Sequence, residues 1–117
     1  MFNHEKLDAW RKSILFADLV YSGTKIFPSD ERFGLTNQMR RAAVSISSNL
    51  AEGCSRRSKA DFRRFIEIAV GSVFELVSPA EIARNPGFLS PTQHRELRDS
   101  GLEIVRMLAG LSGSLEG

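Results

Sequence analysis

Four stretches of the chain repeat apolar residues at the three- and four-residue spacing of an amphipathic α-helix, and this periodicity limits the possible folds more than any other feature. The stretches cover about residues 3–26, 35–52, 58–84 and 90–115. None of them alternates apolar and polar residues as a half-buried strand does. Four amphipathic helices joined by short turns pack as a bundle. The sequence therefore predicts one all-α domain over residues 1–117, a single antiparallel up-down-up-down four-helix bundle.

Individual residues indicate where these helices begin, end or bend. Thr36 is the predicted N-cap of the second helix, and Gly53 is placed to be the left-handed residue after its end. Ser90, which is followed by Pro91, is the predicted N-cap of the fourth helix. Pro79 falls inside the third pattern, and the apolar spacing continues beyond it, so we expect a kink there.

The first helix has more apolar residues than one buried face needs. Its predicted core stripe is Leu7, Trp10, Ile14, Ala17 and Tyr21. Further apolar residues lie off the core stripes of the first and third helices, namely Leu15, Phe16, Leu19, Val20, Val70 and Phe74. Surplus apolar surface is typical of self-association, so these residues are the predicted oligomer interface. The alternative is that they widen the core of the monomer.

Positive charge is concentrated in the middle of the chain. The overall formal net charge is +2, which is too small by itself to indicate a nucleic-acid partner. Residues 1–39 carry five basic and five acidic residues, residues 40–64 carry seven and two, and residues 65–117 carry four and seven. The middle segment therefore has a local net charge of +5.

The basic residues of this middle segment are the candidate nucleic-acid contacts: Arg40, Arg41, Arg56, Arg57, Lys59, Arg63 and Arg64. Antiparallel packing puts the turn before the third helix at one end of the bundle, with Arg40 and Arg41 about three turns back along the second helix. The cations are thus predicted to form a band along one side. All but one are arginines, which suit bidentate phosphate contacts with little sequence specificity.

The polar face predicted for the second helix mixes neutral hydrogen-bonding groups with few charges. It comprises Asn37, Gln38, Arg41, Ser45, Ser48, Asn49 and Glu52. These residues fall within roughly 120° of arc at 3.6 residues per turn. Two interpretations stay open: a solvated face, or a surface that faces a partner subunit or a sugar–phosphate backbone.

No arrangement of residues predicts a catalytic or metal centre. Di-iron bundles use Glu-x-x-His pairs, and no glutamate here is followed three residues later by a histidine. His4 and His94 are far apart in the sequence and have no second ligand at a helical spacing. Cys54 lies beside Arg56 and Arg57, whose charge would favour the thiolate, although an ordinary free thiol is the simpler interpretation. We therefore predict a protein that is not an enzyme and that uses no metal or cofactor.

The sequence also predicts no association with a membrane. No apolar run approaches the ~20 residues that a membrane-spanning helix needs, and the N-terminus lacks the pattern of a signal peptide. The single cysteine excludes an internal disulfide and fits a reducing compartment. We therefore expect a cytoplasmic protein.

The segment from Gly34 to Gly53 has the sequence GLTNQMRRAAVSISSNLAEG. It resembles the four-helix-bundle proteins encoded in intervening sequences of bacterial 23S ribosomal RNA genes. Further matches to that family span nearly the whole chain, at Leu7-x-x-Trp10, Tyr21, Phe27-Pro28, Arg56, Phe65, Ala69-Val70-Gly71-Ser72 and Glu75-Leu76. The chain departs from the family pattern at Ser78-Pro79.

The resemblance implies a small bundle that assembles into a homo-oligomer, as a ring-like pentamer, without enzymatic activity. The family is similar to the accessory protein of diversity-generating retroelements, a basic bundle that binds nucleic acid and a reverse transcriptase. Carried over by position, the residues in the matching motif are Arg40, Arg41, Ser45, Asn49, Glu52 and Arg56.

The leading hypothesis is a homo-oligomeric bundle that binds RNA or DNA through the phosphates. The first alternative is an oligomeric scaffold for a protein partner, without nucleic acid. The second is an enzyme that uses Cys54 or a serine, for which neither histidine is placed in the sequence to act as a base.

Overall fold

The computed structural model describes residues 1–116, and four long helices account for most of them. These are α1 (Asp8–Thr24), α2 (Leu35–Cys54), α3 (Lys59–Arg84) and α4 (Pro91–Ser114). Two short 3₁₀ helices, η1 (Asn3–Lys6) and η2 (Ser29–Glu31), precede α1 and α2, and the described residues contain no strand. The predicted all-α class and its four helices are confirmed. Gly117, the last residue of the predicted domain, lies outside the described residues.

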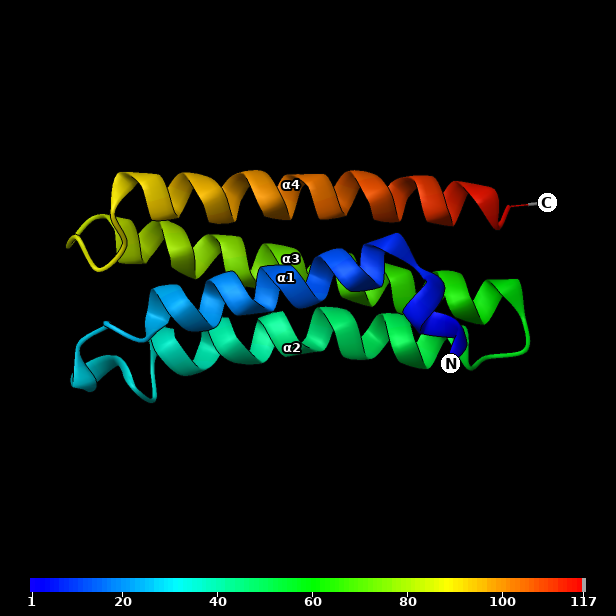
Figure 1. The fold of residues 1–117 in the computed structure, drawn as a ribbon, viewed down its shortest axis with the longest axis horizontal. Coiled ribbons are helices and arrows are strands. Elements are labelled where there is room, and N and C mark those ends of the chain that lie inside the picture. Colours follow the sequence, from blue (N-terminus) through cyan, green and yellow to red (C-terminus); the bar gives the residue numbers. More distant parts are fainter. Residues whose placement is uncertain (117) are drawn as a thin grey trace.

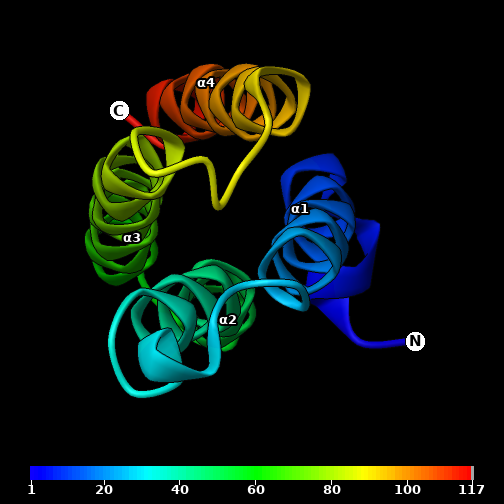
Figure 2. The ribbon, with the colours of Figure 1, turned by 90° about the vertical axis from the view of Figure 1, so that its left-hand side faces the viewer.

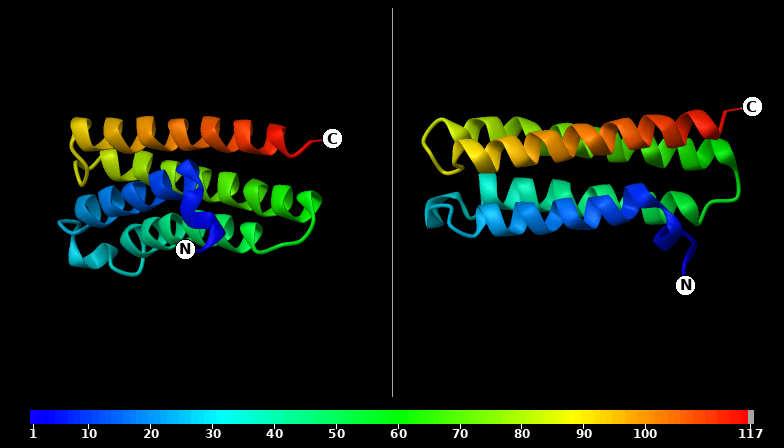
Figure 3. Two further views of the ribbon diagram at one scale, coloured as in Figure 1. Left: turned by 45° about the vertical axis from the view of Figure 1, so that its right-hand side comes forward. Right: turned by 45° about the horizontal axis from the view of Figure 1, so that its top comes forward.

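The helices form an antiparallel bundle that measures 46 × 22 × 21 Å. The α1–α2 and α3–α4 connections lie at one end, and the α2–α3 connection lies at the other, so consecutive helices run in opposite directions (Figure 1). Viewed along its axis, the bundle places each helix between two neighbours around a shared centre (Figure 2). The N-terminal segment with η1 crosses the outside of the bundle and packs against α2 (Figure 3). Both termini lie toward the end with the α2–α3 connection (Figure 1).

The core faces of α2, α3 and α4 follow the apolar spacing of the sequence. Met39, Ala43, Ile46 and Leu50 of α2 are fully buried. On α3 the buried face runs from Phe65 to Ala83, and on α4 it includes Leu97, Ile104 and Leu108. Each large apolar side chain that is fully buried contributes about 1.5–3 kcal/mol to folding. This closed core fixes which side of each helix remains available for binding.

The predicted core stripe of α1 is only partly correct. Trp10 and Ala17 are half-buried and pack against the core, but the fully buried face is rotated about the helix axis from the predicted one. The residues of α1 that face the core are Ala9, Ser13, Phe16, Val20, Gly23 and Thr24, whereas Ile14 and Tyr21 are exposed. The buried face is lined by small residues around one phenylalanine and one valine. Ser13 can be buried because its hydroxyl donates to the Trp10 carbonyl at 2.6 Å, which satisfies the polar group within the helix.

The start of α1 and the N-cap of α2 also differ from the prediction. Leu7 is extended (φ −80°, ψ 124°), so the first predicted helix is divided into η1 and α1. At α2 the helix begins at Leu35, one residue before the predicted cap Thr36. The Glu31 carboxylate accepts a hydrogen bond from the Leu35 amide at 3.2 Å, so it satisfies a free amide of the first turn in place of an N-cap side chain.

Gly53 and Pro79 both lie within helices. Gly53 is a buried residue of α2 with ordinary helical backbone, and the glycine with positive φ in residues 1–116 is Gly87 (φ 85°), in the turn after α3. Helix α3 continues through Pro79, which is buried. Pro79 has no amide hydrogen to donate to the Glu75 carbonyl, so the helix loses one hydrogen bond there without ending. The predicted cap of α4 is confirmed, because Ser90 accepts from the Gln93 amide at 3.1 Å.

Candidate nucleic-acid interface

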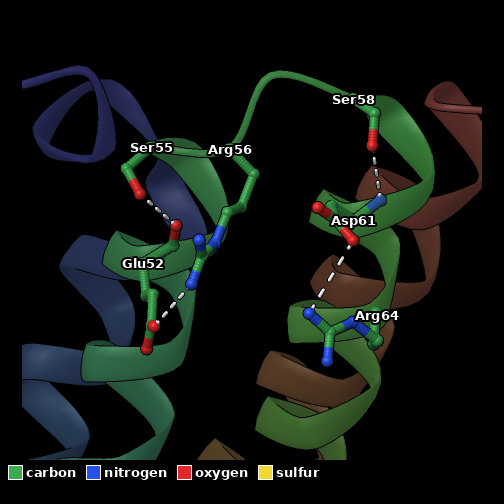
Figure 4. Close-up of polar contacts among 6 residues, drawn as sticks. All are labelled: Glu52, Ser55, Arg56, Ser58, Asp61 and Arg64. Carbon is green, nitrogen blue, oxygen red and sulfur yellow. Dashed lines mark hydrogen bonds and ion pairs between the residues drawn. The ribbon is translucent and has the colours of Figure 1, made fainter.

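The α2–α3 connection is a tight turn held by hydrogen bonds at both of its ends (Figure 4). At the end of α2, the Ser55 hydroxyl donates to the Glu52 carbonyl at 2.6 Å. At the start of α3, the Ser58 hydroxyl accepts from the Asp61 amide at 3.1 Å and caps the helix. The turn between them carries Arg56 and Arg57, so the fold presents both residues at the end of the bundle.

Two arginines of this end pack against one aromatic ring. The guanidinium groups of Arg56 and Arg64 each lie 4.9 Å from the centroid of Phe65, within the range of a cation–π contact. Arg56 also pairs with Glu52 at 2.8 Å, and Arg64 with Asp61 at 3.7 Å (Figure 4). These contacts hold both side chains in place and neutralise part of their charge. Exposed ion pairs of this kind contribute at most about 1 kcal/mol each to stability.

The remaining cations of this end have no acidic partner within residues 1–116. Arg57 and Lys59 are exposed, and Arg63 is half-buried. We call the five cations of this end the end cluster: Arg56, Arg57, Lys59, Arg63 and Arg64. Residues 52–64 carry these five cations and two carboxylates, a local net charge of +3. The unpaired cations make this end available to a polyanion.

Arg40 and Arg41 lie apart from the end cluster. They precede Cys54, the last residue of α2, by about 20 Å along the helix axis, at 1.5 Å per residue. Arg40 turns toward α1, where it donates to the Thr24 hydroxyl at 2.9 Å and lies 4.7 Å from the centroid of the Tyr21 ring. Arg41 is exposed and faces α3. The seven predicted contacts therefore form one cluster and two separate residues, not a continuous band.

A polar hollow of about 460 Å³ lies between the first half of α2 and α3, and we call it the polar groove. It is lined by Phe33, Gly34, Asn37, Gln38, Arg41, Ala42, Ser45 and Glu75. Farther along the same face of α2, polar groups bond within the protein: Ser45 and Ser72 share a hydrogen bond at 2.8 Å, and Asn49 donates to the Ser45 carbonyl. Sequence reasoning missed Phe33, although an aromatic residue between Arg32 and Gly34 in a turn was a visible signal.

The predicted oligomer interface is only partly on the surface. Phe16 and Val20 are 1% and 0% exposed and belong to the core, so for these two residues the alternative interpretation is correct. Leu19 and Val70 are half-buried. Leu15 and Phe74 are 60% and 62% exposed. Phe74 borders an apolar hollow of about 190 Å³ between α3 and α4, the apolar groove, lined by Val73, Phe74, Val77, Arg98, Gly101, Leu102 and Val105.

Comparison with known proteins identifies the family of this chain. The family described as "23S rRNA-intervening sequence protein" matches residues 5–110. The chain belongs to this family. The match covers all four helices except the last turn of α4, and the resemblance expected from the Gly34–Gly53 segment is confirmed. A comparison with curated proteins gave no match.

A solved structure of similar fold comes from Bacteroides thetaiotaomicron and is described as a protein of unknown function from the S23 ribosomal protein family. It is 23% identical in sequence, with a TM-score of 0.80 over 89% of this chain and 97% of that chain. At this level of identity the similarity concerns the fold. The bundle described above is therefore shared with that protein.

Cys54, His94 and His4 were the other candidate groups, and the structure places each of them in different surroundings. Burial raises the pKa of the Cys54 thiol, so desolvation works against the thiolate that its cationic neighbours were expected to favour. His94 Nε2 lies 2.6 Å from Glu81 Oε2 and ties α4 to α3, while His4 packs on Trp10. In the described part of the chain, no three His, Cys, Asp or Glu side chains gather as a metal site requires.

None of the helices within residues 1–116 combines the length and the hydropathy needed to cross a bilayer. The four helices of this family member bury their apolar faces against one another, as in other helical bundles.

Proposed function

We propose that this protein is a non-enzymatic, homo-oligomeric, cytoplasmic bundle that binds nucleic acid through the phosphate backbone. The observation that supports this most is the end cluster, in which Arg57, Lys59 and Arg63 lie free of acidic partners within residues 1–116. Arginine presents a planar fork of donors that fits a phosphate, and release of counterions from the nucleic acid supplies the free energy of binding.

In the proposed contact the end cluster binds the phosphate backbone of the nucleic acid and not the edges of its bases. The cations of the end cluster come from one turn and the first turns of α3, so they form a compact patch and not a helix that could enter a groove. Contacts of this kind fix position and carry little sequence information. We therefore expect similar affinities for oligonucleotides of unrelated sequence, and a steep loss of affinity as the salt concentration rises.

A triple variant, Arg57→Ala, Lys59→Ala and Arg63→Ala, tests the proposal. We expect weaker binding to every oligonucleotide, because three phosphate contacts are removed. The slope of log K against log salt should fall in magnitude by roughly 2 for single strands and 3 for duplexes. Fluorescence anisotropy with labelled RNA and DNA over a series of salt concentrations measures both quantities.

The matched control removes the same charge elsewhere. Lys25, Arg95 and Arg106 are exposed and line neither groove, and replacing all three with alanine lowers the net charge equally. This control variant should keep the affinity and the salt slope of the wild type. If both variants lose the same affinity, binding follows the overall charge and the end cluster is not the site.

The apolar groove supports the proposed self-association and also a second candidate function. Exposed Phe74 and Leu102 border the groove, and contiguous exposed apolar surface is typical of a protein interface. The pentamer expected from the family resemblance stays a prediction. If the oligomer binds no nucleic acid at low salt, the function to test next is a scaffold for a protein partner.

A further inference from the structure

Phe33 is the most exposed aromatic side chain of the described residues, at 87%. It lies in the connection between η2 and α2, at the mouth of the polar groove, where no helix packs against it. Its nearest aromatic or cationic neighbour is the guanidinium of Arg32, 5.6 Å from the ring centroid. Exposing a phenylalanine ring to water is unfavourable, so a ring in this position gains free energy when another flat group covers it.

The groups beside Phe33 can hydrogen-bond to the edge of such a flat group. Asn37 and Gln38 each supply an amide with both donors and an acceptor, and Glu75 across the groove supplies an acceptor. Arg41 lies in the same groove and makes no ion pair within residues 1–116. The groove thus combines an aromatic face, two neutral amides, one carboxylate and one free cation.

From this combination we infer that the polar groove is a subsite for an unpaired nucleotide. The base stacks on Phe33, its edge bonds to Asn37, Gln38 or Glu75, and its phosphate lies on Arg41. Single-stranded nucleic acids are recognised in this way, by stacking on aromatic rings and hydrogen bonds to exposed base edges. The inference rests on the proposed function, to which it adds a preference for unpaired strands.

The subsite and the end cluster are connected by the outer face of α2. Arg41 lies about 20 Å along α2 from Cys54, where the helix ends next to the end cluster. A single strand of several nucleotides can therefore contact the end cluster with its backbone while one base enters the groove. A rigid duplex offers no unstacked base to Phe33, so the groove adds nothing to duplex binding.

The experiment compares the binding affinities of Phe33→Ala, Phe33→Trp and the wild type for three probes. The probes are an unstructured 12-nucleotide RNA, a duplex of the same sequence, and a strand of the same length with abasic sites in place of bases. Phe33→Ala should weaken binding to the unstructured strand on the order of tenfold, as the loss of one stacked base does. Phe33→Trp should keep the wild-type affinity. Binding to the duplex and to the abasic strand should be equal in wild type and Phe33→Ala.

Ile26→Ala is the matched control, since Ile26 is exposed in the connection between α1 and η2 but does not line the groove. Equal binding of the unstructured RNA by wild type and Phe33→Ala overturns the subsite, and the end-cluster triple variant then tests the proposed function by itself. A change of oligomeric mass in Phe33→Ala, measured by light scattering, also overturns it, since the groove would then be an interface between copies. No binding of any probe by the wild type at low salt overturns both.

Discussion

Gly53 is the residue at which the geometry of the α2–α3 connection depends most directly on side-chain size. A Cβ atom at this position would lie 2.9 Å from both the Cδ1 of Phe62 and the Cβ of Phe65, too close for either to remain in place. The ring of Phe65 in turn makes cation–π contacts with the guanidinium groups of Arg56 and Arg64. The absence of one side chain on α2 therefore helps to place two cations of the end cluster.

Gly53→Ala should destabilise the protein. The clash with the first turns of α3 costs about 1–3 kcal/mol, and the better helix propensity of alanine offsets at most about 1 kcal/mol of it. Gly110→Ala is the control, because nothing lies within 4 Å of a Cβ at Gly110. That variant should be as stable as the wild type or more stable. Urea unfolding of both variants measures the difference, and equal midpoints would contradict the packing argument.

At the scale of the helices, the sequence was sufficient wherever apolar spacing and helix-end signals agreed. The bounds of α2, α3 and α4 were predicted to within two residues. The buried face of α1 was not predicted correctly, because apolar residues recur at three- and four-residue spacings on two faces of this helix. The prediction chose the face with Trp10, Ile14 and Tyr21, whereas the bundle buries the one with Ala9, Ser13 and Phe16. Small residues that permit close helix packing leave no signal in a search for large apolar side chains.

The candidate site was predictable in composition but not in arrangement. The middle segment's positive charge is a property of the sequence. Which cations are free depends on tertiary contacts, such as that of Arg40 with Thr24 and Tyr21. The polar groove requires α2 and α3 to lie side by side. Phe33 and Glu75 are 42 positions apart in the sequence, so the sequence alone could not predict that both line the groove.

The register of α1 is tested by neighbouring substitutions. Phe16→Ala should lower the free energy of unfolding by about 3–5 kcal/mol, because it leaves a cavity in the core. Leu15→Ala should change it by about 0.5 kcal/mol or less, as expected for an exposed position. Chemical denaturation at one fixed protein concentration measures both. A larger loss for Leu15→Ala than for Phe16→Ala would contradict the burial of Phe16 and the register of α1.

At the scale of the whole molecule, charge and apolar surface are separated. The end cluster occupies the end of the bundle with the α2–α3 connection, and the apolar groove lies along α3 and α4. Copies that associate through the apolar groove would leave their end clusters uncovered. Several clusters in one assembly would then engage one polyanion together, which strengthens binding without any new contact in a single protomer.

Phe74→Asp tests this arrangement. We expect a lower oligomeric mass by size exclusion with light scattering, because the carboxylate would have to be buried without a partner. Ile26→Asp places the same charge on an exposed residue outside the apolar groove and should leave the mass unchanged. If Phe74→Asp and the wild type have the same mass, the groove is not the interface between copies.

The even number of antiparallel helices has a practical consequence for anyone who labels or tethers this protein. Both termini point toward the end that carries the end cluster (Figure 1). A fluorophore, affinity tag or surface anchor joined to either terminus would stand next to the cations whose binding it is meant to report. The exposed turn at Asn85, Pro86 and Gly87 lies at the opposite end, and exposed turns of this kind accept insertions and attached groups best. Immobilisation through that turn would leave the cations facing solution.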